Sequence, residues 1–212
     1  ADVAPIGIAP DGLNINDASG ATSPQALTSE VLKQEAHLGI ALDGDGDRVL
    51  LVDAAGRSYD GDQLLYAIAR HRAGREKLAG VAGTLMTNFA FEKAMQRLGI
   101  AFERARVGDR YVLELMRNRG WQLGGENSGH IICLDKHTTG DGIVSALQVL
   151  HAMRESGRAL AELTADLVMY PQVLVNVAVP RGFDWRSHRS IAQAQADAEQ
   201  SLNGRGRVLL RP

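Results

Sequence analysis

The chain of 212 residues is 45% hydrophobic and 23% charged, a balance typical of a soluble globular protein with a sizeable core. Its formal net charge of -2 and pI near 6.3 give no overall basic field, so neither nucleic acid nor a membrane is an expected partner. The single cysteine, Cys133, excludes an internal disulfide framework, and no signal peptide or apolar span of membrane length is visible. These features predict a cytoplasmic location.

The first third of the chain predicts a loop, a helix and two strands. Residues 1–23 are rich in Gly, Pro, Asn and Asp and predict a loop, with at most a short strand at 3–8. A helix is expected from Ser23 to about Ala36. Buried strands should follow at 38–42 and 49–52.

Helices and strands alternate from there to about residue 166. The expected elements are a helix capped by Asp60 or Asp62, a strand at 80–84, a helix from Asn88 to Leu98, a strand at 101–107, a helix at 111–118, strands at 121–124 and 131–134, and a helix capped by Asp141 with Ile143, Val144, Leu147 and Leu150 on its apolar face. This alternation predicts an α/β domain with a mixed sheet. A ligand site is expected where loops gather beyond the strand ends.

The composition changes near Met169, which predicts a domain boundary. Residues 172–179 alternate like a strand, and 187–202 form an Ala/Gln-rich helix pattern. We therefore expect a preceding tail and linker at 1–23, an α/β domain at 24–168 and an incomplete, smaller α+β domain at 169–212. The chain opens without Met and closes on an apolar strand pattern after Gly206, so we expect a fragment of a longer protein.

The stretch DGDGDR at 43–48 carries the strongest chemical pattern. Asp43, Asp45 and Asp47 alternate with glycines, and carboxylates this close repel one another unless a cation lies among them. Their hard oxygens suit Mg²⁺, Mn²⁺ or Ca²⁺ rather than zinc. Arg48 adds a planar fork that suits a phosphate oxygen beside the metal.

Two other interpretations fit this stretch less well. A calcium-binding EF-hand needs Gly at the sixth loop position and Glu at the twelfth, where this chain has Arg48 and Ala54. A solvated turn is the simpler alternative, and the apolar strands on both sides together with the adjacent arginine disfavour it.

A second polar loop, GENSGH at 125–130, is the candidate substrate site. Glu126, Ser128 and His130 alternate, so an extended loop would present all three on one side. A carboxylate, a hydroxyl and an imidazole suit the hydroxyls of a sugar, with His130 as a hydrogen-bond donor rather than a general acid or base. A hairpin turn with incidental polar residues is the alternative.

The other histidines and a group of arginines are expected at the surface. The histidines, which show no metal-ligand spacing, are His37, His71, His137, His151 and His188, and the arginines are Arg70, Arg72 and Arg75. His137 is a weaker site candidate, because its loop leads into a helix N-terminus, where anions bind.

Together, segments 43–48 and 125–130 resemble the metal loop and the sugar loop of the α-D-phosphohexomutase superfamily. The resemblance covers nearly the whole chain, through segments 10–16, 107–112, 138–143 and 203–208. It is closest to the bacterial members that act on glucosamine phosphates. Asn127 is a discriminating position, because relatives acting on phosphomannose or phosphoglucose typically carry Met or Glu there.

The resemblance implies an isomerase that interconverts glucosamine 6-phosphate and glucosamine 1-phosphate, through a phosphoserine and a bisphosphate, for UDP-N-acetylglucosamine and cell-wall synthesis. It implies one Mg²⁺ on Asp43, Asp45 and Asp47, and hexosamine or glucose 1,6-bisphosphate as activator. It gives Arg48 a catalytic role and assigns substrate binding to Glu126, Ser128, His130, Asp109 and Arg110. The implied partners are the phosphosugar and the remaining domains of the same enzyme, and a homodimer is compatible with it.

The chain departs from the superfamily in what it lacks. No segment resembles the TASHNP-type loop that bears the phosphorylated serine, and the chain stops before the SGTEP-type phosphate loop. We therefore expect these 212 residues to bind metal and sugar without turning over alone. The alternatives are a phosphomannomutase or phosphoglucomutase of the same superfamily, and a non-catalytic module that binds phosphosugar or metal.

Overall fold

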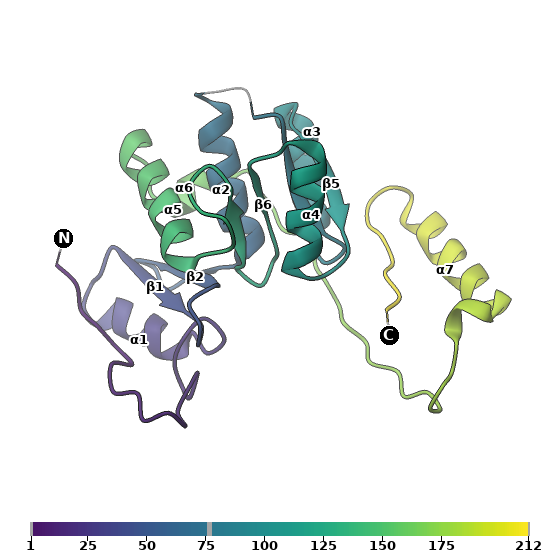
Figure 1. Cartoon of the computed structure of the whole chain (residues 1–212), viewed down its shortest axis with the longest axis horizontal. Coiled ribbons are helices and arrows are strands. Elements are labelled where there is room, and N and C mark those ends of the chain that lie inside the picture. The colour runs from purple at the N-terminus through teal and green to yellow at the C-terminus, as the bar shows by residue number, and fades with distance from the viewer. Residues whose placement is uncertain (1, 76–77, 212) are drawn as a thin grey trace.

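A computed structural model of the protein describes residues 2–75 and 78–211 and contains two sheets (Figure 1). The smaller sheet is antiparallel, in the order β1 (Leu38–Leu42), β2 (Val49–Asp53), β3 (Ser58–Tyr59). The larger sheet has the order β5 (Ala101–Ala105), β4 (Gly80–Thr84), β6 (Leu123–Gly125), β7 (Ile131–Cys133). Strand β4 runs parallel to β5 and β6, whereas β7 is antiparallel to β6, so the predicted mixed sheet is confirmed.

Helices cover both faces of the larger sheet and make three layers. Helix α4 (Asp109–Arg119) lies on one face, and α2 (Gly61–Ala73), α3 (Phe89–Leu98) and α5 (Gly142–Ser156) lie on the other, with the short α6 (Leu160–Leu163) beside α5. Neighbouring residues of a strand point to opposite faces. Val81 accordingly joins the core under α2, whereas Ala82 packs against Val112 and Met116 of α4.

The smaller sheet is held between α1 (Gln25–Lys33) and α5. Leu27 and Val31 of α1 pack on Val52, while Leu51 faces the main core. The backbone N–H of Val49 also donates to the Gly129 carbonyl at 3.1 Å, which ties the smaller sheet to the turn between β6 and β7. This contact brings the two predicted site loops together.

The predicted helix boundaries follow from their capping residues. Asp60 and Gln63 form a capping box at the start of α2, and the side chains of Asn88 and Asp141 accept N–H bonds at the starts of α3 and α5. Gly99 ends α3 in the left-handed conformation that glycine adopts most easily. These four sequence predictions are confirmed.

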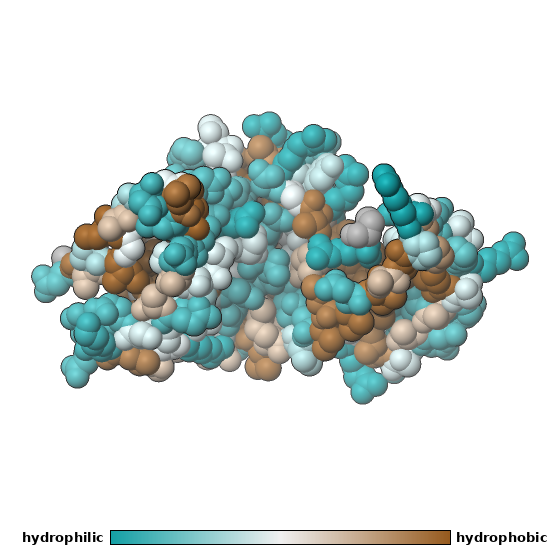
Figure 2. Space-filling model, turned by 90° about the horizontal axis from the view of Figure 1, so that it is seen from below, coloured by the Kyte–Doolittle hydropathy of each residue, from teal (hydrophilic) through white to brown (hydrophobic). Residues whose placement is uncertain are grey.

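Two predicted strands are wrong, and the short strand that the sequence allowed at 3–8 does not form. Within the described residues, no strand forms at 3–8, at 172–179 or after Gly206, although the helix expected at 187–202 is present as α7 (Arg189–Leu202), preceded by the 3-10 helix η1 (Trp185–Ser187). Alternation predicts that a segment can be a strand, but pairing also needs a neighbouring edge. The side chains of Val173, Val175 and Val177 remain exposed, and Figure 2 shows hydrophobic surface on the side of the molecule where this C-terminal segment lies. The domain boundaries at 23/24 and 168/169 stay predictions.

Two side-chain predictions on the helices are also wrong. Ile143 and Leu147 of α5 are 58% and 54% exposed, and α5 instead buries the small residues Ser145 and Ala146 together with Val149 and Ala152. Small side chains let α5 approach α2 closely. Arg72 was expected in solvent but is buried, where it pairs with Asp135 at 2.9 Å.

Candidate functional site

The acid loop, residues 43–48, connects β1 and β2 as a tight hairpin turn. One carboxylate oxygen from each of Asp43, Asp45 and Asp47 lies within 4.8 Å of the others. The turn depends on Gly46, whose φ of +73° is left-handed and whose N–H donates to the Asp43 carbonyl at 3.2 Å. The loop geometry therefore concentrates three negative charges at one point.

Arg48 offsets part of this charge. Its backbone N–H donates to Asp43 Oδ1 at 3.1 Å. Its Nε lies 3.6 Å from Asp43 Oδ2 and 3.7 Å from Asp47 Oδ1, and its side chain is 45% exposed. These are loose contacts, which leave the guanidinium accessible to an anion in solution.

His130 lies behind Asp47. Its ring is 3% exposed, its Nδ1 lies 3.0 Å from Asp47 Oδ2, and Gly140 packs so closely on it that a Cβ there would come within 2.2 Å of Nε2. An ionised Asp47 requires the proton on Nδ1, which then donates to the carboxylate. The ring thus holds Asp47 from the protein side, and it does not face an open sugar site as the sequence predicted.

The acid loop fits a hard divalent cation. Burial raises the pKa of Asp47, the charge of His130 opposes this rise, and the charges of Asp43 and Asp45 add to it. Asp47 Oδ1 is buried and accepts no hydrogen bond from any described residue. Oxygen donors that repel one another in this way suit Mg²⁺, Mn²⁺ or Ca²⁺.

The second loop is a turn, not an extended segment. Gly129 has a φ of +96°, and its N–H donates to the Glu126 carbonyl at 3.0 Å. Ser128 is therefore exposed at the tip, His130 points inward, and Glu126 Oε1 accepts the Gly108 N–H at 2.9 Å. The expectation that Glu126, Ser128 and His130 share one side is wrong.

The first residue of α2 and the residue before α4 contact this turn. The N–H of Gly61 in α2 donates to the Asn127 carbonyl at 3.0 Å, and a Cβ at Gly61 would lie 2.0 Å from the Glu126 carbonyl oxygen. Asp109 and Arg110 begin α4 directly after Gly108 and are exposed. Both side chains are accessible near Glu126.

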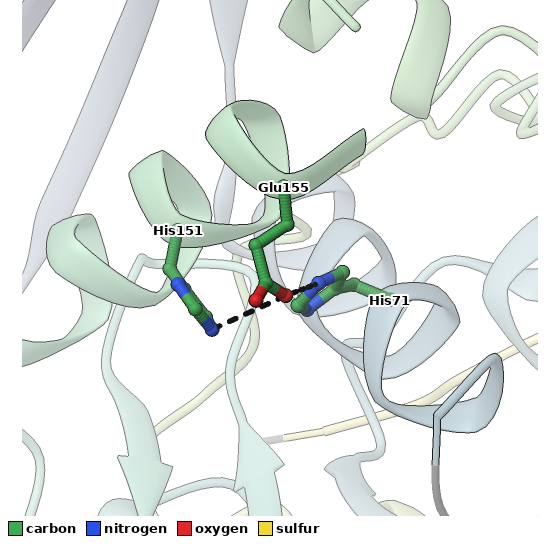
Figure 3. Close-up of side chains that lie close together, drawn as sticks. All are labelled: His71, His151 and Glu155. Atoms are coloured by element: carbon green, nitrogen blue, oxygen red, sulfur yellow. Dashed lines mark hydrogen bonds and ion pairs between the residues drawn. The ribbon is translucent and has the colours of Figure 1, made fainter. Parts of the chain in front are cut away.

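The structure also gathers three residues that sequence analysis missed. His71 of α2 and His151 and Glu155 of α5 bring one ligand atom each within 4.8 Å of the others; they are called the histidine cluster below (Figure 3). The spacing of His151 and Glu155, four residues apart on a helix, was the available sequence pattern. His71 carried none, because it is far away in the chain.

His137 is the weaker site candidate of the sequence analysis. His137 is exposed, and its N–H donates to the Cys133 carbonyl at 2.9 Å. Within the part of the chain that the structure describes, no helix has the length and apolar character needed to cross a membrane. The cytoplasmic location stays a prediction.

Comparisons with known proteins agree on the family. Residues 60–170 match the family described as phosphoglucomutase/phosphomannomutase, alpha/beta/alpha domain III. The chain is 63% identical over 212 residues to a phosphoglucosamine mutase of Aromatoleum aromaticum and 60% identical over 212 residues to one of Azoarcus sp.. Each alignment covers 100% of this chain and 47% of the relative, so the chain spans about half the length of these curated relatives.

Solved structures show the same fold. The N-acetylphosphoglucosamine mutase of Aspergillus fumigatus, in complex with GlcNAc-6P and magnesium, has a TM-score of 0.68 and 21% identity over 92% of this chain and 50% of that chain. A putative phosphomannomutase from Thermus thermophilus has a TM-score of 0.64 and 22% identity over 69% of this chain and 34% of that chain.

Proposed function

Because the chain belongs to the phosphoglucomutase/phosphomannomutase family, we propose that it forms the metal- and sugar-binding part of an enzyme that interconverts glucosamine 6-phosphate and glucosamine 1-phosphate. The convergence of three carboxylates beside Arg48 carries this proposal. The amino sugar is supported by relatives of 60–63% identity whose names specify phosphoglucosamine, and by Asn127 in the sugar loop.

In this proposal Asp43, Asp45 and Asp47 hold one Mg²⁺. The bound ion supplies Lewis-acid polarisation of a phosphoryl oxygen, which is the main requirement of phosphoryl transfer. Arg48 stabilises negative charge on the same phosphate, since its guanidinium is partly exposed beside Asp43. His130 keeps Asp47 oriented from behind through the 3.0 Å contact.

The turn at 125–130 is proposed to hold the sugar. Ser128 is exposed at its tip, and Glu126 is fixed by the Gly108 N–H, so a hydroxyl and a carboxylate are available to sugar hydroxyls. Asp109 and Arg110 are exposed at the start of α4 and are proposed to contact the substrate as well. The phosphoserine and the response to a 1,6-bisphosphate activator are assigned to the whole enzyme, beyond these 212 residues. A homodimer stays a prediction.

A substrate comparison tests the proposal. The whole enzyme that contains this chain is assayed with Mg²⁺ and glucose 1,6-bisphosphate on glucosamine 6-phosphate, mannose 6-phosphate and glucose 6-phosphate. We expect the highest kcat/KM on glucosamine 6-phosphate and complete loss of activity in EDTA, restored by Mg²⁺. Higher kcat/KM on either neutral sugar would indicate the phosphomannomutase or phosphoglucomutase alternative.

A second experiment uses the isolated chain. We expect the 212-residue chain to bind Mg²⁺ without mutase turnover. Sustained turnover by this chain alone would contradict the assignment of the phosphoserine to other residues. Inactivity of the whole enzyme on all three sugars would favour a non-catalytic binding module.

A further inference from the structure

We propose that the histidine cluster is a binding site for a divalent transition metal ion such as Zn²⁺. It consists of His71, His151 and Glu155 and lies on the outer side of α2 and α5. The site is separate from the acid loop, which supplies only oxygen atoms from its carboxylates.

The three side chains converge on one point. His71 Nε2 lies 2.9 Å and His151 Nε2 lies 3.4 Å from the same oxygen, Glu155 Oε2. The two rings are perpendicular, with an interplanar angle of 87° and centroids 5.3 Å apart, so they meet edge to face instead of stacking. Figure 3 shows both imidazoles and the carboxylate directed toward one another from the two helices.

This donor set selects the class of metal. Two imidazole nitrogens and a carboxylate suit Zn²⁺ and neighbouring transition metals, whereas Mg²⁺ and Ca²⁺ prefer oxygen ligands. His71 has a side-chain exposure of 13% and His151 one of 53%. The site is therefore open on the His151 side, where an ion can enter and water can complete its coordination.

The helices provide a firm base for these ligands. His151 and Glu155 lie one turn apart on α5, and α2 packs against α5 along the same core. Ligands on packed helices keep their geometry better than ligands on loops. A bound ion would link the two helices.

Nearby charges allow a cation to bind. His71 and His151 line a cavity of about 460 Å³ whose other lining residues include Arg72, Arg75 and Lys136. Arg72 and Lys136 already pair with Asp135, at 2.9 and 3.1 Å. Arg75 contacts Glu155 and is 56% exposed, so it is the one of these three cations that must move away when a metal binds.

The carboxylate of Glu155 is available as an anion. Desolvation raises the pKa of Glu155, but the His71 hydrogen bond, the charges of Arg75 and His151 and the Arg75 hydrogen bond together lower it below its usual value.

Calorimetric titration with Zn²⁺ tests the site. The chain carries no polyhistidine tag and is kept in excess Mg²⁺, which occupies the acid loop. We expect one Zn²⁺ per chain, with the affinity lowered at least about tenfold by His71→Asn, His151→Asn or Glu155→Gln. His37→Asn, an exposed histidine just after α1, is the matched control and should leave the affinity unchanged.

Further variants separate a metal from other ligands. Arg75→Gln removes the competing cation and should tighten Zn²⁺ binding, whereas weaker Zn²⁺ binding by this variant would contradict the proposal. Zn²⁺ should also raise the Tm of the wild type but not that of His71→Asn/His151→Asn, since an ion that binds only the folded state stabilises it. Equal Zn²⁺ affinity in the wild type and the double variant would contradict the proposal, provided that circular dichroism in EDTA shows both proteins to be folded.

An anion is the remaining alternative. Inorganic phosphate is titrated in the same way, and binding of phosphate without binding of Zn²⁺ would replace the metal site by an anion site on Arg72, Arg75 and Lys136. All these readouts measure binding to the isolated chain. They are independent of mutase activity, so the proposed function can fail without affecting this inference.

Discussion

The acid loop and the histidine cluster each gather three ligand atoms within 4.8 Å, yet the protein builds them in different ways. All three aspartates belong to one hairpin turn, where Gly46 sets the backbone conformation. The three residues of the histidine cluster come from two helices, and their geometry depends on how α2 packs against α5. One site is local, and the other is a product of tertiary structure.

The same two helices connect the sites. Gly61 at the start of α2 contacts the turn at 125–130, and the N–H of Gly142 at the start of α5 donates to the Gly46 carbonyl at 2.9 Å. His71 and His151 lie roughly 14–15 Å further along these helices, at about 1.5 Å per residue. In the two proposals taken together, the oxygen ligands lie at one end of these helices and the nitrogen ligands at the other.

The largest expected effect comes from the acid loop. Asp45→Asn in the whole enzyme should lower kcat at least about 1,000-fold, because Asp45 is proposed to hold the metal where phosphoryl charge must be stabilised. Zn²⁺ affinity at the histidine cluster should stay unchanged in the same variant. The control is Asp197→Asn on the exposed surface of α7. A parallel loss of Zn²⁺ binding would show that the two sites are not separate.

Asp62 is a buried carboxylate outside the acid loop. It is fully buried in α2, its Oδ2 accepts the Asn88 N–H at 2.7 Å, and Oδ1 has no hydrogen-bond partner among the described residues. Burial, aided by the charge of Asp60, raises the pKa of Asp62 from 3.8 to about 7, against the Asn88 bond and the charges of Arg104 and Arg207. The folded state therefore holds this proton more tightly than the unfolded state does.

The sign of the pH dependence follows from linkage. Stability from this proton is fully present below about pH 4 and is lost as the pH rises through about 7. Asp62→Asn keeps the acceptor without titrating, so the free energy of unfolding of the variant relative to wild type should increase by up to about 4 kcal/mol across that range. Urea unfolding at both ends of the range measures this. Parallel pH profiles of the two proteins would contradict it.

A pair of glycine substitutions compares the two ends of α2. Gly61→Ala should lower the free energy of unfolding by about 1–3 kcal/mol, because the new Cβ would clash with the backbone of the turn at 125–130. Gly74→Ala, at the other end of α2, has its nearest neighbour 3.5 Å away and should be neutral or slightly stabilising. Thermal unfolding of both variants decides this, and equal Tm values would mean that the loop yields to the methyl group.

Much of the fold could be predicted because its determinants are local. Asp60, Asn88, Asp141 and Gly99 fix helix ends through contacts within a few residues, and the DGDGDR loop presents its carboxylates through its own turn. The mixed sheet and the layered fold followed from the alternation of helices and strands.

The failures all involve distant partners. Residues 172–179 have the pattern of a strand, but a strand needs a neighbouring edge that the pattern does not contain. Helix α5 is apolar on more than one side, so periodicity selected Ile143 and Leu147 instead of the face that packs on α2. The histidine cluster was missed for the same reason, since nothing near His71 in the sequence points to His151.

The smallest expected effect concerns His130, whose ring contacts Asp47 of the acid loop. His130→Ala should raise the Mg²⁺ concentration for half-maximal activity about tenfold, because an outer partner orients a ligand without touching the metal. His130→Asn, which keeps an N–H donor toward Asp47, should recover part of this loss, and excess Mg²⁺ should restore the rate. His37→Ala is the control. If His130→Ala instead changed KM for the sugar at every Mg²⁺ concentration, the ring would contact substrate directly, as the sequence first suggested. The His130 ring would then be part of the sugar site. The separation of oxygen ligands from nitrogen ligands would still describe the two proposed metal sites, but not the sugar site.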